Sequence, residues 1–261
     1  MAVHAAASLR KTSFLALISF VGLSLACGGG GTSGLGSGGG AGTVPIFVTE
    51  MHSATDGAGA GFNSSTLSIN VTGTNTLLIA AWHAEFDSGL PWTVDDNGTL
   101  GTELVVTDGY TGGAGNHLFR IYYWLHPPAG ANSVSVTNAS TGANELAFSV
   151  VLFNNVAQTS PTGTPVLDVS TTARTGESET VPTGNNDLVL HVIADALLTR
   201  GSLGNGETSI SVANDGHHPA DGDASLWFST KQVSSSSTTV SSSGWASRVI
   251  NGVGIAVHGT T

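Results

Sequence analysis

The feature that most constrains the fold of this chain is an internal repeat. The segment Thr72–Phe86, TGTNTLLIAAWHAEF, returns 111 residues later as Thr183–Leu197, TGNNDLVLHVIADAL. Each copy begins with a polar Thr-Gly-x-Asn turn and continues as an apolar run without a helix cap or a 3.6-residue stripe. Such a run predicts a β-strand that is buried on at least one face. The repeat therefore predicts two similar halves, at about residues 66–156 and 178–258.

Composition favours an all-β chain. The sequence has 36 glycines and only 10% charged residues, which argues against long surface helices. Short runs of Val, Ile, Thr and aromatic residues, separated by turns rich in Gly and Asn, are typical of strands. The expected strands are Ile46–Glu50, Thr66–Val71, Thr76–Phe86, Glu103–Thr107, His117–Leu125, Ser133–Thr137, Glu145–Phe153, Ser178–Val181, Asp187–Ala196, Ser209–Ala213, Ala224–Val233, Thr238–Ser241 and Val249–His258.

The two halves run in parallel order. Each has an aromatic strand, a short strand of Ser and Thr, and a closing apolar strand. One half alone would leave an apolar face and two open edges in water. We therefore predict a single domain over residues 44–261 that forms a two-sheet antiparallel sandwich of jelly-roll type, built from both halves.

The N-terminus predicts export. In residues 1–26, Arg10 and Lys11 precede an apolar run that is too short for a membrane span and typical of a signal peptide. The end of the run, LSLAC, resembles the bacterial lipobox, and the resemblance implies that Cys27 is lipidated and becomes the mature N-terminus. The alternative is an ordinary secretory signal with an incidental cysteine. Residues 27–43 then form a flexible Gly-rich tether, so we expect an extracytoplasmic, lipid-anchored protein of the bacterial cell envelope.

Charge and cysteine content exclude several classes of partner. The formal net charge is −11, and removal of the signal peptide takes it to about −13. This charge repels nucleic acid and anionic lipid, so we expect no nucleic-acid binding and membrane contact only through the lipid anchor. A neutral ligand or a cation suits such a surface. Because Cys27 is the only cysteine, no internal disulfide stabilises the domain.

The aromatic strand resembles a known class of module. The segment Arg120–Gly130, RIYYWLHPPAG, followed by NSVSV, resembles a segment of exported bacterial β-sandwich modules in which a Trp-Tyr-Leu strand leads into Pro-x-x-Gly. The later pair Gly244-Trp245, before the closing strand, fits the same pattern. The resemblance implies a carbohydrate-binding or cell-surface jelly roll and carries over no catalytic residue.

Strand alternation assigns the candidate ligand site. It places the rings and hydrogen-bond donors of one strand on a single face, the kind of surface that binds a sugar; the alternative is a second, partly covered sheet face. The end of the strand Thr76–Phe86, with His83 and Glu85, and the following loop with Trp92 supply a candidate rim of this site. The alternative is a polar strand end that faces solvent. The candidate ligand-binding residues are Arg120, Tyr122, Trp124, His126, His83, Glu85 and Trp92.

One loop concentrates candidate metal ligands. The segment Asn214–Asp223 contains Asp215, His217, Asp221 and Asp223. Carboxylates and loop carbonyls suit Ca²⁺, whereas paired imidazoles with a carboxylate suit Zn²⁺ or another transition metal. The alternative is a solvated acidic loop without a metal.

Three functions remain open on the sequence alone. The first is a membrane-tethered glycan-binding module whose partner is a polysaccharide or cell-surface glycan. The second is a polysaccharide hydrolase or lyase, for which Arg120, Tyr122 and His126 are the residues to examine. The third is a structural or adhesive surface domain whose aromatic residues are only core. The sequence has no Gly-x-Ser-x-Gly or His-Glu-x-x-His motif, which favours a module without catalysis.

Overall fold

The computed structural model describes residues 45–56, 64–86, 92–112, 115–138, 143–195, 201–214, 224–233 and 235–260. All of them belong to one compact unit, residues 41–261. Over these ranges the chain forms seventeen strands, and none of the described residues form a helix long and apolar enough to cross a membrane. The predicted signal peptide, Cys27 and the tether lie outside the described residues.

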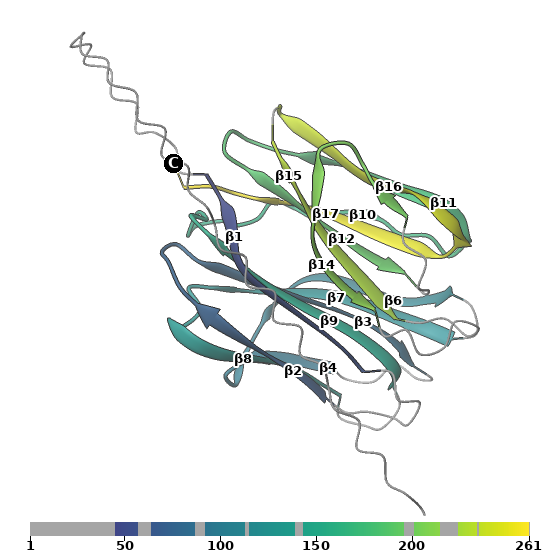
Figure 1. Ribbon diagram of the computed structural model, residues 1–261, viewed down its shortest axis with the longest axis horizontal. Coiled ribbons are helices and arrows are strands. Elements are labelled where there is room, and N and C mark those ends of the chain that lie inside the picture. The colour runs from purple at the N-terminus through teal and green to yellow at the C-terminus, as the bar shows by residue number, and fades with distance from the viewer. Residues whose placement is uncertain are drawn as a thin grey trace, which may run out of the picture. The chain divides into compact units, whose positions relative to one another are not determined.

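The first half of the chain forms two antiparallel sheets (Figure 1). The sheet that we call the first inner sheet contains, in spatial order, β1 (Phe47–Asp56), β9 (Ala143–Asn154), β3 (Leu77–Phe86), β7 (Gly115–Leu125) and β6 (Thr102–Gly112). The first outer sheet contains β2 (Ser64–Val71), β8 (Gly130–Asn138), β4 (Trp92–Asp96) and β5 (Thr99–Leu100).

The second half repeats this arrangement. Its inner sheet contains, in spatial order, β10 (Val166–Asp168), β17 (Ile250–Val257), β12 (Leu188–Asp195), β15 (Ser225–Gln232) and β14 (Glu207–Asn214). Its outer sheet contains β11 (Arg174–Pro182), β16 (Ser237–Arg248) and β13 (Ser202–Leu203). Strand for strand, the second inner sheet has the order of the first, so the internal repeat in the sequence is a repeat of structure.

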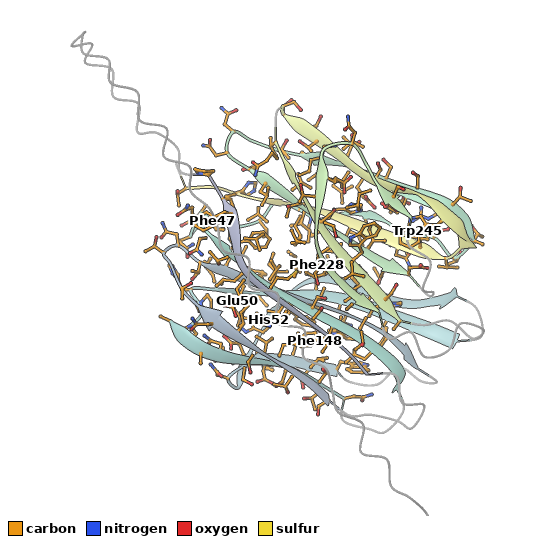
Figure 2. The ribbon with its side chains drawn as sticks, in the orientation of Figure 1. Phe47, Glu50, His52, Phe148, Phe228 and Trp245 are labelled. Carbon is orange, nitrogen blue, oxygen red and sulfur yellow. The ribbon has the colours of Figure 1, made fainter. Side chains whose placement is uncertain are left out.

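The four sheets form layers with three interfaces. The largest buried cluster joins the two inner sheets, with Ile79 and Phe119 from the first half and Val192 and Phe228 from the second. A second cluster fills the first half between its inner and outer sheets, with Trp82 and others. Smaller apolar clusters lie within the second half. Figure 2 shows side chains filling the space between the layers.

The all-β class, the antiparallel pairing and the two similar halves are confirmed, but the predicted single pair of sheets is wrong. The reason is visible in β3, whose residues are buried on both faces. Leu77, Ile79 and Ala81 face the other half, whereas Leu78 and Trp82 face the first outer sheet. Since both inner sheets need cover on both faces, each half forms its own sandwich and the two sandwiches pack together.

All thirteen expected strands exist, and four short strands were missed: β4, β5, β10 and β13. The first two form a hairpin around the turn Asp95–Gly98. Asn97 and Gly98 have φ angles of 50° and 82°, which is the geometry of a hairpin turn with two left-handed residues. The segment Asp95–Gly98, with Gly98 available for a positive φ, is typical of a hairpin turn, but the two strands that flank it are hard to predict because one of them has only two residues.

Candidate functional site

The predicted aromatic row is not a solvent-exposed platform. Tyr122 and Trp124 are 6% and 7% exposed and belong to the cluster between the inner and outer sheets of the first half. Trp124 also donates a hydrogen bond from Nε1 to the carbonyl of Thr99, at 2.9 Å. Both rings lie on the same face of β7, as alternation predicted, but the first outer sheet covers that face. Of the two alternatives that the sequence left open for these rings, the burial matches the covered sheet face.

Arg120 and Tyr122 share one carboxylate partner. The Tyr122 hydroxyl donates to Glu103 Oε2 at 3.2 Å, and Arg120 Nη1 lies 3.5 Å from the same oxygen. Arg120 Cζ also lies 6.0 Å from the centre of the Trp82 ring. Burial raises the pKa of Tyr122 above its usual value of 10. The hydroxyl therefore keeps its proton and acts as a donor at the edge of the sandwich.

The other predicted site residues do not gather with this pair into an exposed rim. His83 is fully buried on the face of β3 that meets the second half, and its Nδ1 lies 3.2 Å from the carbonyl oxygen of Ser225. Trp92 is 6% exposed, and its ring lies 4.6 Å from that of Trp82. His126 is exposed, just after β7. Among the members of the set whose side chains the structure describes, only His126 and part of Arg120 keep open surface, and a ligand-binding role for the set stays a prediction.

The side chain of Glu85 and the whole loop with Asp215, His217, Asp221 and Asp223 lie outside the described residues. The predicted Ca²⁺ site on that loop therefore stays a prediction.

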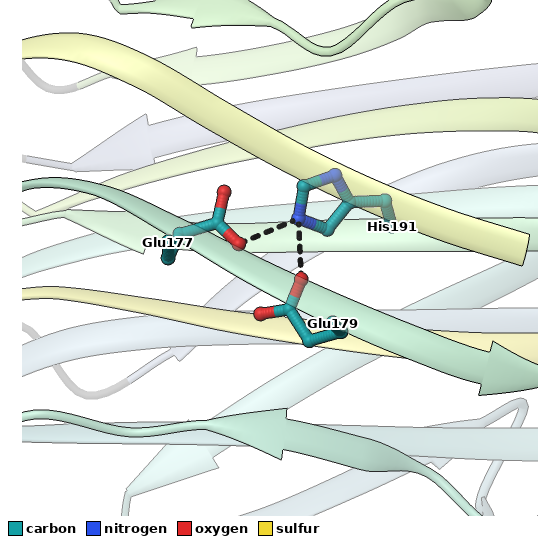
Figure 3. Close-up of side chains that lie close together, drawn as sticks. All are labelled: Glu177, Glu179 and His191. Carbon is teal, nitrogen blue, oxygen red and sulfur yellow. Dashed lines mark hydrogen bonds and ion pairs between the residues drawn. The ribbon is translucent and has the colours of Figure 1, made fainter.

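The second half contains a buried polar cluster that the sequence analysis missed. His191 on β12 points between the inner and outer sheets toward Glu177 and Glu179 on β11 (Figure 3). His191 Nε2 lies 3.2 Å from Glu177 Oε2 and 3.4 Å from Glu179 Oε2. All three side chains are fully buried. These three residues could hold a metal ion, since one ligand atom from each lies within 4.8 Å of the others.

The second nitrogen of His191 is held by another carboxylate. His191 Nδ1 lies 2.8 Å from Oε2 of Glu207, on β14, whose side chain is also fully buried. Glu207 Oε2 accepts a hydrogen bond from the Ser229 hydroxyl, and its Oε1 accepts one from the backbone N–H of Ser241, both at 2.8 Å. Both oxygens of Glu207 are thus satisfied, and the imidazole ring is fixed from that side.

Protonation in the cluster follows from burial and from the close charges. Burial opposes a charge on His191, but hydrogen bonds with Glu177 and Glu207 outweigh it and raise the pKa of His191 to about 10. Burial likewise raises the pKa of Glu177 and of Glu207, but His191 outweighs it and holds both pKa values below 4.5. Burial, followed by the neighbouring Glu177, raises the pKa of Glu179 to about 9. Without a metal, a cationic imidazole therefore lies between two carboxylates and a neutral carboxyl group.

The sequence carried a signal for this cluster. His191 is the one titratable side chain between Leu188 and Ala194, a run otherwise made of Leu, Val, Ile and Ala. Glu177 and Glu179 alternate with Ser178 and so share the face of Val181. An ionisable residue inside a buried strand requires a polar partner. The preceding strand in the sequence has two glutamates on the face that it shares with Val181. The metal site was instead predicted in the loop after Asn214, where Asp and His residues lie close together in sequence.

Comparison with models of known protein families, with curated proteins and with solved structures finds no match to this chain.

Proposed function

We propose that the protein is a non-catalytic surface module of the bacterial cell envelope, anchored by lipid at Cys27, which adheres to glycan through its two outer sheets. The observation that carries the proposal is that the solvent side of both outer sheets presents rows of hydroxyl side chains. We call these two surfaces the hydroxyl faces. Their members include Thr66, Ser68 and Ser135 in the first half and Ser178, Thr180 and Thr239 in the second.

The hydroxyl groups pair across neighbouring strands. Thr66 is opposite Ser135, and their hydroxyl oxygens lie 2.9 Å apart. Thr180 is opposite Thr239 in the second half, with the two oxygens 3.0 Å apart. Each hydroxyl both donates and accepts hydrogen bonds, as the hydroxyl groups of a sugar do. The paired hydroxyl groups themselves carry no charge, and two arrays of this kind support adhesion to a neutral, hydrated polymer by direct and water-mediated hydrogen bonds.

Strand order supports a jelly roll within each half. In the first half, β1-β9-β3-β7 packs on β2-β8-β4-β5, which is the order in which two interleaved Greek keys fold together. The second half has β10-β17-β12-β15 and β11-β16-β13 in the corresponding places. We infer that each half is a small jelly roll and that the domain is a tandem pair. This keeps the predicted fold type but assigns it to each half.

The arrangement of Arg120 and Tyr122 supports adhesion over catalysis. In a lyase or hydrolase that used these residues, the tyrosine would need to exchange a proton with substrate. Instead burial raises its pKa, and both side chains are engaged with Glu103. Their arrangement is that of a hydrogen-bonded edge of the sandwich.

A retention assay tests glycan adhesion. Full-length protein in detergent is passed over insoluble cellulose, chitin and peptidoglycan, and we expect retention on at least one of them. The double variant Thr66→Val/Thr180→Val removes one hydroxyl pair from each face, so retention should fall by about fivefold or more, since each lost pair costs about 0.5–1.5 kcal/mol. Thr208→Val, an exposed change on the edge strand β14, is the matched control and should be retained like the wild type. The proposal would be contradicted if all three proteins were retained equally, or if none of them were retained on any of the polymers.

Removal of the lipid site tests the anchor. Cys27→Ser eliminates the thiol that a lipobox lipidates, so this variant should leave the membrane fraction for the soluble fraction after processing. The wild type should sediment with membranes and carry the lipid on Cys27, as mass spectrometry of the N-terminal peptide would report. A mature wild-type N-terminus other than Cys27 would refute the anchor.

A further inference from the structure

We propose that Glu177, Glu179 and His191 bind a divalent transition metal ion between the two sheets of the second half, and that Zn²⁺ fits the site best. This site is independent of the hydroxyl faces and goes beyond the proposed adhesion. Four observations carry it: the separation of the ligand atoms, an unsatisfied buried carboxylate, a partner that orients the imidazole, and the contrast with the first half.

The separations from His191 Nε2 to the two carboxyl oxygens match a tetrahedral ion. For metal–ligand bonds of about 2.0–2.1 Å, the corners of a tetrahedron lie about 3.3–3.4 Å apart. His191 Nε2 lies 3.2 Å from Glu177 Oε2 and 3.4 Å from Glu179 Oε2. An ion can therefore replace the protons between these atoms with little movement of the side chains.

Glu179 is unsatisfied among the residues that the structure describes. Its side chain is fully buried, yet neither of its oxygens has a hydrogen-bond partner, and His191 Nε2 lies 3.4 Å from Oε2. Oε1 of Glu177 has no hydrogen-bond partner either. Buried carboxyl oxygens without hydrogen-bond partners are costly, and a cation that displaced the proton of Glu179 would be bound by these oxygens and would satisfy them.

Glu207 orients His191 as a metal ligand requires. Metal-binding histidines commonly donate their second ring N–H to a carboxylate, which fixes the tautomer and leaves the other nitrogen free to ligate. Glu207 lies 2.8 Å from His191 Nδ1 and is itself held by Ser229 and Ser241. Nε2, the nitrogen that faces Glu177 and Glu179, is then the ligand atom. We assign Glu207 as a positioning residue.

The first half is an internal control for the fold. His191 lies opposite Ser229 on β15, and the matching pair in the first half is Ala80 and Tyr122. Gly252 lies opposite Ile193, where the first half has Phe148 opposite Trp82. The same architecture therefore closes this interior with apolar side chains in one copy. The charged residues in the second copy are not needed for the fold.

Gly252 makes room for the two carboxylates. A Cβ atom at this position would lie 2.0 Å from Glu179 Oε1 and 2.4 Å from Glu177 Oε2, far inside contact distance. Phe148 fills the equivalent place in the first half and is fully buried there. The second half therefore has no side chain at the position where the first half has an aromatic ring, and two acidic side chains converge there.

The donor set selects the kind of ion. Ca²⁺ takes six to eight oxygen ligands at about 2.3–2.6 Å, whereas this site offers one nitrogen and two carboxylates at tetrahedral spacing. Imidazole with carboxylates suits Zn²⁺ and related transition metals. Three protein ligands leave a fourth position for water, as in zinc sites that are not closed by protein alone.

Zinc loading of the full-length protein tests the site. Because the ligands are buried, the protein is unfolded with chelator in detergent, refolded with or without ZnCl₂, and freed of unbound metal by gel filtration. The background carries Cys27→Ser, so that the single thiol cannot bind the ion. We expect one equivalent of Zn²⁺ per chain by elemental analysis and a melting temperature several degrees above that of the metal-free protein. Co²⁺ in place of Zn²⁺ should give the visible absorption of a tetrahedral complex.

Three variants locate the ion. Glu179→Gln should lower Zn²⁺ affinity at least about 100-fold while keeping the near-ultraviolet circular dichroism of the fold, because glutamine has the same shape. Glu207→Gln should lower affinity about 10–100-fold, as expected for a group that orients a ligand. The third variant, Asp215→Asn/His217→Gln, changes the loop that the sequence analysis favoured and should bind Zn²⁺ like the wild type.

Each contrary result overturns the assignment. Zinc that binds the wild type and Glu179→Gln equally well lies elsewhere, as does zinc that the loop variant fails to bind. Retention of Ca²⁺ but not of Zn²⁺ would contradict the transition-metal assignment, and retention of neither ion would show that the cluster is a proton-sharing network and not a metal centre.

Discussion

Replacing Trp124 by alanine should destabilise the domain by about 3–5 kcal/mol, the cost of emptying a buried aromatic site. The ring is 7% exposed in the cluster between the two sheets of the first half. Its Nε1 donates to Thr99, and a Cβ on Gly101 would lie 2.8 Å from the ring, so the surrounding backbone is fitted closely to the indole. Urea denaturation of full-length protein in detergent, followed by tryptophan fluorescence, measures the loss.

The neighbouring strand supplies the control. Leu100 on β5 is 69% exposed, so Leu100→Ala should change the free energy of unfolding by no more than about 0.5 kcal/mol. Polysaccharide retention by any Trp124→Ala protein that remains folded should equal that of the wild type, because the ring does not reach solvent. If the variant keeps the wild-type stability but loses retention, the indole is a ligand platform and the hydroxyl faces are not the adhesive surface.

Much of the fold could be predicted because it follows from local pattern. Alternation assigned the two faces of β7 correctly, and the repeat predicted two similar halves. The turn at Gly98 followed from its sequence alone. The number of sheets could not be predicted from the sequence. Because β3 is buried on both faces, it is a continuous apolar run, and such a run does not indicate whether the sheets that cover its two faces come from the same half or from the other half.

The candidate site was harder to predict for a related reason. Tyr and Trp are amphipathic, so the row with Tyr122 and Trp124 fits an exposed platform and a covered face equally well until the covering sheet is known. The Glu177, Glu179 and His191 cluster requires the pairing of β11 with β16 and of β12 with β15, which are contacts between distant parts of the chain. The Asp and His residues of the loop after Asn214 were easier to assign to one site because they are close in sequence. Closeness in sequence alone does not establish a site.

The second large effect is expected at His191. In chelator, where no metal balances the carboxylates, His191→Leu should cost about 3–5 kcal/mol, because removal of the cation leaves buried carboxylates without a partner. His191 contacts Glu177 at 3.2 Å and Glu207 at 2.8 Å, and all three side chains are fully buried. Leucine has a similar volume, so the loss reports charge and hydrogen bonding more than a cavity. Urea denaturation at pH 7 measures it.

Glu179→Gln is the matched control for His191→Leu. The pKa of Glu179 is raised to about 9, so this carboxyl group is neutral in the folded protein at pH 7 but ionised in the unfolded chain. Glutamine removes that cost of protonation, and the variant should be as stable as the wild type or more stable. A loss similar to that of His191→Leu would mean that Glu179 is charged in the metal-free fold.

The cost of His191→Leu should shrink at acid pH. Glu177 and Glu207 have pKa values below 4.5 in the folded wild type, so the stability that they provide is present above pH 4.5 and is lost as the pH falls through their folded pKa values. His191 is protonated in the fold over this whole range, since its pKa there is about 10, and below the unfolded value of 6.5 it is protonated in both states and adds no further pH dependence. In the variant the same carboxyl groups become neutral at low pH and cease to be unpaired charges. Below pH 6.5, wild type and variant should therefore converge in stability as the pH falls toward about 4, and a gap that widens with acid in this range would mean that the cost arises from packing and not from the carboxylates.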